Sequence, residues 1–482
     1  MKKFVVIITG ILIFIGIMNS CTKKEEPTIP DVQKTVVAML TAEKNIQLTQ
    51  TSIASGFTPT CTPTLTITPN ITQTIIAILT FVGEAAATQT QIAKDTQTAE
   101  ASLWTATATP TATITVTSTV TPTATITPTN TKIPFYVIKI AAGGDHSFAI
   151  KQYGVALWGT GYNEFYQLGT GDNLTRDIWS YVQSGIDKIA GGGRYSLATK
   201  INNTLWVTGW NNTGQLGLGD TISRTTWTQV TGMANVSAIA AGELHSLAIK
   251  EDGTLWVTGW NNTGQLGLGD TESRTTWTQV TGIADVSAID AGNNHSLAIK
   301  EDGTLWVAGY NFYGQLGLGD TISRTTWTQV TGMANVSAIA VGEFHSLAIK
   351  EDGTLWVTGN NNRGQLGLGD TIDRTTWTQV TGIADVSAIA AGNDHSLAIK
   401  TDGTLWVTGY NFYGQLGLGD KITRTTWTRV TGMTNVSAIA CGYYYSIAIK
   451  ENGTLWVTGN NTSGQIGLGD NSDKLTWTQV LE

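Results

Sequence analysis

Short runs of alternating apolar and polar residues dominate the chain after Phe135, and they recur in a fixed order. In one copy the runs read VSAIAA, HSLAIK, TLWVTG and TTWTQV, and they begin at Val236, His245, Thr254 and Thr275. Period-two alternation with many β-branched and aromatic residues is typical of strands, and no run shows the period of an amphipathic helix. Each copy is therefore predicted to form four strands.

The four runs return about every fifty residues. The phrase IAAGELHSLAIK and its variants begin at Ile140, Ile189, Ile239, Ile289, Ile339, Ile389 and Ile439. A second phrase, from LWVTG to TWTQV, has its first tryptophan at Trp158, Trp206, Trp256, Trp306, Trp356, Trp406 and Trp456. Repeated four-stranded antiparallel units can protect their edges by closing into a ring. We therefore predict an all-β, seven-bladed β-propeller of four-stranded antiparallel blades over residues 135–482.

Glycine and tryptophan recur at fixed places in each repeat. Asp252 and Gly253 separate two predicted strands, and this pair is a strong hairpin signal because both residue types tolerate positive φ. The glycines of GQLGLGD permit sharp turns and a close approach of neighbouring blades. The tryptophans of LWV and of TWT are both expected in the core, where large rings pack one blade against the next.

The phrases GELHSLAI, DGTLW and NNTGQLGLGD also resemble the repeats of the regulator of chromosome condensation (RCC1) family. The resemblance covers residues 135–482, and membership of the family implies a seven-bladed propeller. The Gly-Gly pair of kelch repeats and the Trp-Asp pair of WD repeats are not features of this repeat. In the family a tryptophan usually precedes the glycine of the WG-N--GQLG phrase. Here Thr258 precedes Gly259, so details of blade packing are expected to differ.

The composition changes at Pro134, which marks a domain boundary. All nine prolines lie at or before this residue, whereas all but four of the 54 glycines follow it. Tracts such as TPTATITVTSTVTPTATITPTNT cannot bury a core and favour extended, solvated chain. Residues 22–134 are therefore predicted to form a partly disordered Thr/Pro/Ala-rich stalk or linker.

Residues 1–21 resemble a lipoprotein-type export signal. Two lysines precede an apolar run from Phe4 to Met18, which is short for a membrane-spanning helix of about 20 residues. Cys21 ends the segment as in the lipobox of bacterial lipoproteins, although Met18 and Asn19 depart from the usual residues. Lipidation of Cys21 is the leading interpretation, with plain secretion and a retained membrane anchor as alternatives. The expected location is the cell envelope or outer surface.

Charge and chemistry exclude several classes of function. A net charge of -8 and a pI near 5.2 provide no cationic surface for a nucleic-acid backbone, so no nucleic-acid partner is expected. No calcium-loop, paired-carboxylate or Ser/His nucleophile phrase occurs outside the repeat frame. Because the repeats are almost symmetric, we expect no enzyme activity, no cofactor and no metal. Cys441 replaces an alanine or valine of other repeats and is expected to be a small buried residue.

One position of the repeat holds histidine in five copies: His146, His245, His295, His345 and His395, with Tyr195 and Tyr445 in the other two. One histidine from each blade rarely converges on a single metal ion, so a structural hydrogen-bonding role is expected. Each repeat also carries an aspartate four residues before an arginine or lysine, as at Asp220 and Arg224. These pairs are predicted to form local salt bridges.

The middle repeats are nearly identical, so the positions at which they differ indicate function. The differences concentrate in the pair after AG and in the TG-N--G loop, where aromatic residues alternate with Asn, Asp and Glu. Rigid aromatic anchors beside adaptable polar groups are typical of binding surfaces, and neutral drift of loop tips is the alternative. The candidate binding face comprises Trp210, Trp260, Tyr310, Phe312, Tyr313, Arg363, Tyr410, Phe412, Tyr413, Leu244, Phe344, Tyr443 and Tyr444.

These observations predict an exported, lipid-anchored monomer whose propeller displays a non-enzymatic face for another extracytoplasmic protein. Some bacterial relatives of the repeat family resemble inhibitors of secreted enzymes that use such a face. The nucleotide-exchange role of eukaryotic members is not expected, because the chain is exported and no repeat carries an inserted segment. A glycan-binding module is the first alternative, since exposed rings beside Asn and Asp also suit sugars. A purely structural surface knob is the second.

Overall fold

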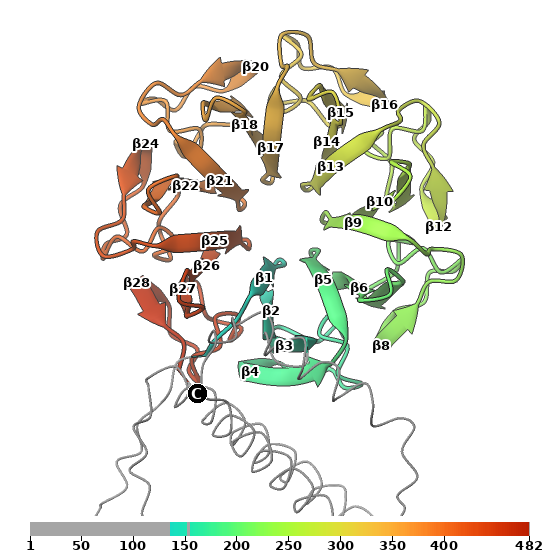
Figure 1. The fold of residues 1–482 in the computed structure, drawn as a ribbon, viewed down its shortest axis with the longest axis horizontal. Helices are drawn as coiled ribbons and strands as arrows, with labels where there is room; N and C mark the ends of the chain where they lie inside the picture. The colour runs from blue at the N-terminus through green and yellow to red at the C-terminus, as the bar shows by residue number, and fades with distance from the viewer. Residues whose placement is uncertain (1–134, 152–154, 482) are drawn as a thin grey trace, which may run out of the picture. The chain divides into compact units, whose positions relative to one another are not determined.

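A computed structural model describes residues 135–151 and 155–481 of the chain (Figure 1). The export-signal segment with Cys21 and the predicted stalk of residues 22–134 lie outside these residues. In the described part of the chain, strands are joined by turns and loops. No helix within those two ranges has the length and apolarity that crossing a bilayer requires.

The strands form seven four-stranded sheets, and we call each sheet a blade. Blades 1 and 2 contain β1 (Lys139–Ala142), β2 (His146–Lys151), β3 (Ala156–Gly161), β4 (Arg176–Gln183), β5 (Ile186–Gly191), β6 (Tyr195–Lys200), β7 (Leu205–Gly209) and β8 (Arg224–Gln229). Blades 3 and 4 contain β9 (Val236–Ala241), β10 (His245–Lys250), β11 (Leu255–Gly259), β12 (Arg274–Gln279), β13 (Val286–Ala291), β14 (His295–Lys300), β15 (Leu305–Gly309) and β16 (Arg324–Gln329). Blades 5 to 7 contain β17 (Val336–Val341), β18 (His345–Lys350), β19 (Leu355–Gly359), β20 (Arg374–Gln379), β21 (Val386–Ala391), β22 (His395–Lys400), β23 (Leu405–Gly409), β24 (Arg424–Arg429), β25 (Val436–Cys441), β26 (Tyr445–Lys450), β27 (Leu455–Gly459) and β28 (Lys474–Gln479).

Each blade is an antiparallel meander of four consecutive strands. The first strand of every blade lies innermost around a central axis, and the fourth strand lies at the rim (Figure 1). The ring is closed because β1 contacts both β5 and β25. The predicted all-β, seven-bladed propeller with four strands per repeat is therefore confirmed.

The hydrophobic core lies between the blades. Leu247 pairs with Val257, and Ile249 pairs with Leu255, across β10 and β11, and all four side chains are at most 2% exposed. They pack against residues of blade 4 such as Ala298, and each of the seven interfaces has a cluster of this kind. Burying one large aliphatic side chain contributes roughly 1.5–3 kcal/mol. The interfaces are therefore the main source of stability.

The two sets of tryptophans differ in burial. The rim-strand set, which includes Trp327, is 6–9% exposed, as predicted. The LWV set, which includes Trp256, is half-buried and packs against the edges of the core clusters, so the prediction that it belongs to the core is confirmed only in part. The Trp256 indole N–H donates to Thr254 Oγ1 at 3.0 Å, and Lys250 Nζ lies 4.2 Å from the ring centroid. Trp256 lies beside the β10–β11 turn, where Lys250 covers one part of the ring while another part packs against the core cluster of blade 2.

Gly264 and Gly253 adopt conformations that other residues rarely adopt. Gly264 has a φ of +82°, and a Cβ atom there would lie 2.6 Å from the Cα atom of Thr325 in the next blade. This is the close approach that was predicted. Gly253 has a φ of 74°, and its N–H donates to Lys250 O at 2.9 Å. Asp252 does not adopt positive φ, so the hairpin uses the left-handed region at one position only.

A polar hydrogen bond joins each pair of neighbouring blades. His345 Nε2 lies 2.9 Å from Ser396 Oγ, and the other four histidines make the equivalent contact at 2.8–3.0 Å. Tyr445 instead donates to His146 O at 2.5 Å, and Tyr195 makes the same kind of bond. Burial lowers the pKa of each histidine to about 3, so the rings are neutral at pH 7. The predicted structural role of this position is confirmed.

The ring closes where the described chain begins. Phe135 N–H donates to Val480 O at 3.1 Å, and Val137 N–H donates to Gly453 O at 2.8 Å. Met333, which follows the rim strand of blade 4, makes the equivalent hydrogen bond. Its N–H donates to the carbonyl oxygen of Val330, as Phe135 N–H donates to that of Val480. Residues 135–137 therefore complete blade 7 in the way that the linker between blades does elsewhere. All four strands of blade 1 and of blade 7 come from their own repeats.

Candidate functional site

Two sets of loops lie at one end of the propeller, which we call the loop face. The inner turn joins the first and second strands of a blade, and the long loop joins the third and fourth. Within blade 3 the two are joined by a hydrogen bond from Trp260 N–H to Leu244 O at 2.8 Å. Between blades, the rings of Tyr313 and Phe344 have centroids 5.1 Å apart. The two variable regions of the repeat therefore form one surface.

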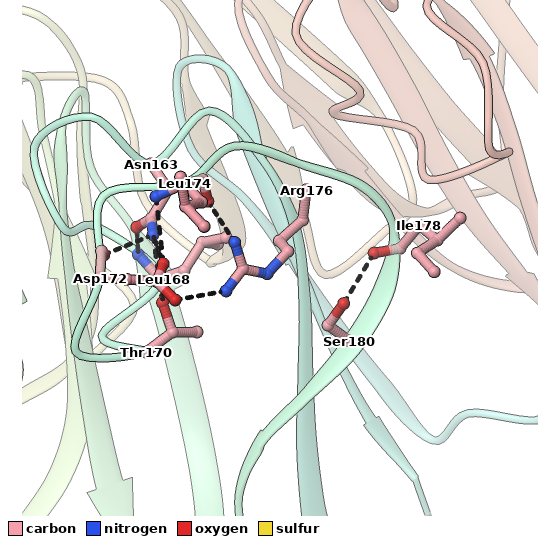
Figure 2. Close-up of polar contacts among 8 residues, drawn as sticks. All are labelled: Asn163, Leu168, Thr170, Asp172, Leu174, Arg176, Ile178 and Ser180. Carbon is pink, nitrogen blue, oxygen red and sulfur yellow. Dashed lines mark hydrogen bonds and ion pairs between the residues drawn. The ribbon is translucent and has the colours of Figure 1, made fainter.

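A polar framework holds each long loop. In blade 1 the Arg176 guanidinium donates to Asp172 Oδ2 and to Leu174 O, both at 2.7 Å (Figure 2). Asn163 Nδ2 donates to Asp172 O, and Asn163 Oδ1 accepts from Leu168 N–H, each at 2.9 Å. All seven blades contain the aspartate–arginine or aspartate–lysine pair, so the predicted local salt bridge is confirmed. The tips of the long loops are thus ordered before any ligand arrives.

Only three of the predicted binding residues are well exposed. Phe312 and Phe412 are 63% and 53% exposed, and Arg363 is also exposed. The others are half-buried: Trp210, Trp260, Tyr310, Tyr313, Tyr410, Tyr413, Leu244, Phe344, Tyr443 and Tyr444. The loop face therefore presents a few exposed rings supported by partly covered ones.

Two aromatic clusters on the loop face have the same architecture. The Tyr310 cluster comprises Tyr310, Phe312, Tyr313 and Phe344, and the Tyr410 cluster comprises Tyr410, Phe412, Tyr413 and Tyr444. In each cluster the first two rings stack with centroids 6.3 Å apart, at interplanar angles of 15° and 11° respectively. The third ring contacts the fourth, at 5.1 Å and 5.3 Å. Each cluster therefore joins a long loop to the inner turn of the next blade.

A third aromatic group lies at blades 1 and 2. The Phe165 ring centroid lies 5.9 Å from that of Trp210 and 6.1 Å from that of Tyr162. The Arg194 guanidinium carbon lies 4.7 Å from the Phe165 centroid and 5.7 Å from the Trp210 centroid. Of these residues only Trp210 was predicted. The others belong to the first two repeats, which depart most from the consensus, so comparison of the middle repeats did not reveal them.

An axial channel of about 440 Å³ is lined by the innermost strands and inner turns of all seven blades. Its carboxyl groups come from Glu243, Asp290 and Glu343. The Tyr443 hydroxyl of blade 7 donates to Glu243 Oε2 of blade 3, so this tyrosine lies at the channel mouth and outside the aromatic clusters. Cys441, expected to be buried, is half-buried in the channel wall, where it forms no disulfide with any described residue.

Burial changes the ionisation of the channel carboxyls. It raises the pKa of Asp290 to about 7, although the carboxylate accepts hydrogen bonds from Val341 N–H at 2.8 Å and from its own neighbour's N–H at 2.9 Å. Burial and the charges of Asp394 and Glu243 raise the pKa of Glu343 to about 7. The other repeats have alanine at the position of Asp290, and this difference was the only sequence signal for the Asp290 carboxyl group. Within the described ranges, no cluster of three or more His, Cys, Asp or Glu side chains could hold a metal ion.

Two family models match the chain, and both describe a regulator of chromosome condensation (RCC1) repeat. One matches residues 202–249, 252–299, 302–349, 352–399 and 402–449. The other matches residues 236–265, 286–315, 336–365, 386–415 and 436–465. Together they cover residues 202–465 without a gap. No curated protein sequence matches the chain.

Several solved structures share the fold. Human WBSCR16 is 22% identical with a TM-score of 0.61, over 67% of this chain and 93% of that chain. Prp20p from Saccharomyces cerevisiae is 21% identical with a TM-score of 0.62, over 72% and 87% of the two chains. A second structure of yeast RCC1 (Prp20), with Kap60, gives 20% identity and a TM-score of 0.62, over 76% and 91%. At this level of identity the likeness concerns the fold.

Proposed function

Because the chain belongs to the regulator of chromosome condensation (RCC1) repeat family, we propose that its propeller is a non-enzymatic module whose loop face binds another protein. The observation that carries this proposal is the pair of matching aromatic clusters on ordered long loops, with Phe312 and Phe412 well exposed. Exposed rings held by rigid neighbours lose little conformational entropy when a partner covers them, which is a property of interface hot spots.

The relatives agree with this class of function. Yeast Prp20p has binding properties toward Gsp1p and histones, and in its second structure it is bound to Kap60. Those partners belong to Prp20p. For this chain they support protein binding as the class of function, and the partner must be sought separately.

We further propose that the chain is exported as a monomer and anchored through a lipid on Cys21, with residues 22–134 as the stalk. The support is the lysine-led apolar segment of residues 1–21, which ends at that cysteine. An alkyne-palmitate label supplied to bacterial cells that produce the full-length protein should mark the native chain and leave a Cys21→Ser variant unmarked. Equal labelling of both chains would overturn the anchor.

The binding face is tested by affinity capture from envelope and secreted proteins. Full-length protein is compared with a Phe312→Ser, Phe412→Ser double variant and with Ile201→Ser. Ile201 is the matched control, because it is 69% exposed and lies in the β6–β7 turn, at the opposite end of the strands from the loop face. A protein retained by the native chain and the control but lost by the double variant is the expected result. Capture that is the same with all three chains would contradict the proposal and favour the glycan or structural alternatives.

A further inference from the structure

The chain itself places cations on two of its three aromatic groups. The guanidinium carbon of Arg363 lies 5.1 Å from the Tyr410 ring centroid, and Lys421 Nζ lies 5.2 Å from the Phe412 centroid. Arg194 lies over the third group, as described above. Cations are attracted to the faces of aromatic rings by the ring quadrupole. The loop face therefore already binds guanidinium and ammonium groups within the molecule.

The Tyr310 cluster has the same arrangement of rings, with Phe344 in place of Tyr444, but lacks these cations. Thr263 and Thr321 occupy the repeat positions equivalent to Arg363 and Lys421. Over the described part of the chain, no lysine or arginine makes a cation–π contact with the rings of the Tyr310 cluster or of Trp260. The two clusters thus form an internal comparison, one occupied by cations and one open.

The backbone is the same at both places. Thr263 N–H donates to Gln265 Oε1 at 3.1 Å, and Arg363 N–H donates to Gln365 Oε1 at 2.9 Å. The side chain alone therefore decides whether the ring of the next blade is covered.

The carboxyl groups of the face show the same asymmetry. Burial raises the pKa of both Glu243 and Asp394, and the nearby guanidinium groups of Arg194 and Arg363, respectively, partly offset that rise. Glu343, which precedes Phe344 of the Tyr310 cluster, has Asn293 Nδ2 at 3.4 Å, and its charged neighbours are the carboxyls of Asp394 and Glu243. Glu343 is therefore next to Phe344 of the open cluster in the chain, and no cation in the described part of the chain is among the groups that shift its pKa.

We propose that the Tyr310 cluster, with Glu343 in the inner turn that also holds Phe344 and with Trp260 in the long loop of the preceding blade, is a docking site for arginine and lysine side chains, so that the partner contributes a basic polypeptide segment. This inference rests on the proposed function and specifies the chemistry of the partner. The ring faces provide attraction to the cation, and the carboxylate provides complementary charge. The net charge of -8 favours the approach of a basic segment.

The test uses the Tyr410 cluster, which is occupied by cations, as the model for a variant of the Tyr310 cluster. Binding of a fluorescein-labelled (Arg-Gly)4 peptide to the full-length protein is measured by anisotropy, with a (Gln-Gly)4 peptide as the uncharged control.

The double substitution Thr263→Arg, Thr321→Lys copies the occupied cluster and should weaken binding of the arginine peptide by at least about tenfold. The reverse substitution, Arg363→Thr with Lys421→Thr, opens the second cluster and should raise the number of bound peptides from one to two. Glu343→Gln should weaken binding by about threefold at pH 8.

Several outcomes would overturn the inference: equal binding of the two peptides, no effect of Thr263→Arg with Thr321→Lys, or binding of a neutral oligosaccharide but not of the arginine peptide. Thermal unfolding of each variant ensures that a loss of binding is not a loss of fold. A captured protein that is lost with Phe312→Ser, Phe412→Ser but kept with Thr263→Arg, Thr321→Lys would leave the proposed function standing and reject the cationic partner. If neither variant loses the captured protein, the proposed function itself fails.

Discussion

The seams between blades and the loop face meet at two neighbouring residues, His345 and Phe344. His345 is fully buried and bonded to Ser396 of the next blade, and its position accepts only histidine or tyrosine among the seven repeats. Phe344 is half-buried in the inner turn, where sister repeats have Asp, Arg, Leu, Asn or Tyr. One step along the chain therefore separates a position set by packing from one free to vary.

This difference shows how a repeat protein can acquire a binding function on one face only. The seam residues satisfy the same polar groups in every blade, so changing one of them breaks a contact on which two blades depend. The loop tips rest on a framework of backbone bonds and aspartate–arginine pairs that does not depend on tip identity. Variation at the tips therefore alters the surface without altering the ring.

The largest effect is expected where a seam glycine gains a side chain. In Gly264→Ala the new Cβ would lie 2.6 Å from Thr325 Cα, in addition to its unfavourable positive φ. We expect a loss of at least about 3 kcal/mol in the free energy of unfolding. Gly232→Ala has a similar φ of +83° but no atom within 4 Å, so it should cost only about 1 kcal/mol. Chemical unfolding of both variants measures this, and equal losses would show that the close approach of blades is not the cause.

His345→Ala is expected to have the next largest effect, a loss of about 2–4 kcal/mol in the free energy of unfolding. It leaves a cavity and removes one of the two hydrogen bonds between Ser396 Oγ and blade 5, the other being the donation to Gln365 O. His345→Tyr is the matched variant, since Tyr445 bridges the same kind of seam in the native ring. His345→Tyr should lower the free energy of unfolding by less than about 1 kcal/mol. Thermal midpoints distinguish the two, and a tyrosine variant as unstable as the alanine variant would reject the equivalence of these side chains.

Asp290→Ala should change stability in a pH-dependent way. The pKa of Asp290 is raised to about 7 in the folded protein, above its value of 3.8 in an unfolded chain, so ionisation destabilises the fold as pH rises from about 4 to 7. The alanine variant escapes this penalty and should be more stable than the native protein by about 1–2 kcal/mol at pH 8, because the channel partly solvates the native carboxylate. At pH 4 the gain should vanish. Melting curves across this range test the sign, and a constant difference would exclude ionisation as the cause.

The smallest effect on stability is expected at the loop tips. Phe312→Ser with Phe412→Ser should change the free energy of unfolding by less than about 0.5 kcal/mol per site, because both rings are mostly exposed. Differential scanning calorimetry checks this. A loss of more than about 2 kcal/mol in total would identify the clusters as structural and favour the surface-knob alternative over binding.

The fold could be predicted because period and repeat number are local properties of the sequence. Strands such as β10 and β11 follow from alternation, and seven copies leave few ways to protect their edges. The half-burial of Trp256 was missed because alternation assigns a ring to one face of a strand but does not say what covers that face. Trp256 is covered partly by the core of blade 2 and partly by Lys250 across a turn.

The candidate site was predicted only in part. Differences among the middle repeats revealed Phe312 and Phe412, but the contact between Tyr443 and Glu243 joins residues 200 positions apart and depends on the closure of the ring. Repeat comparison cannot supply distances across the axis. The Arg194 group was missed because its blades depart from the consensus, so no sister position drew attention to it.

The way the ring closes determines how its blade number can change. Because residues 135–137 join Val480 in the linker between blades, each repeat of about fifty residues encodes one whole sheet and its own side of the interface with each neighbouring blade. Duplication or loss of one repeat in the gene would therefore add or remove a complete blade and would never leave half a sheet unpaired. The number of blades therefore changes by one whole blade at a time. The loop-face residues of each new blade can then diverge independently of those in the other blades.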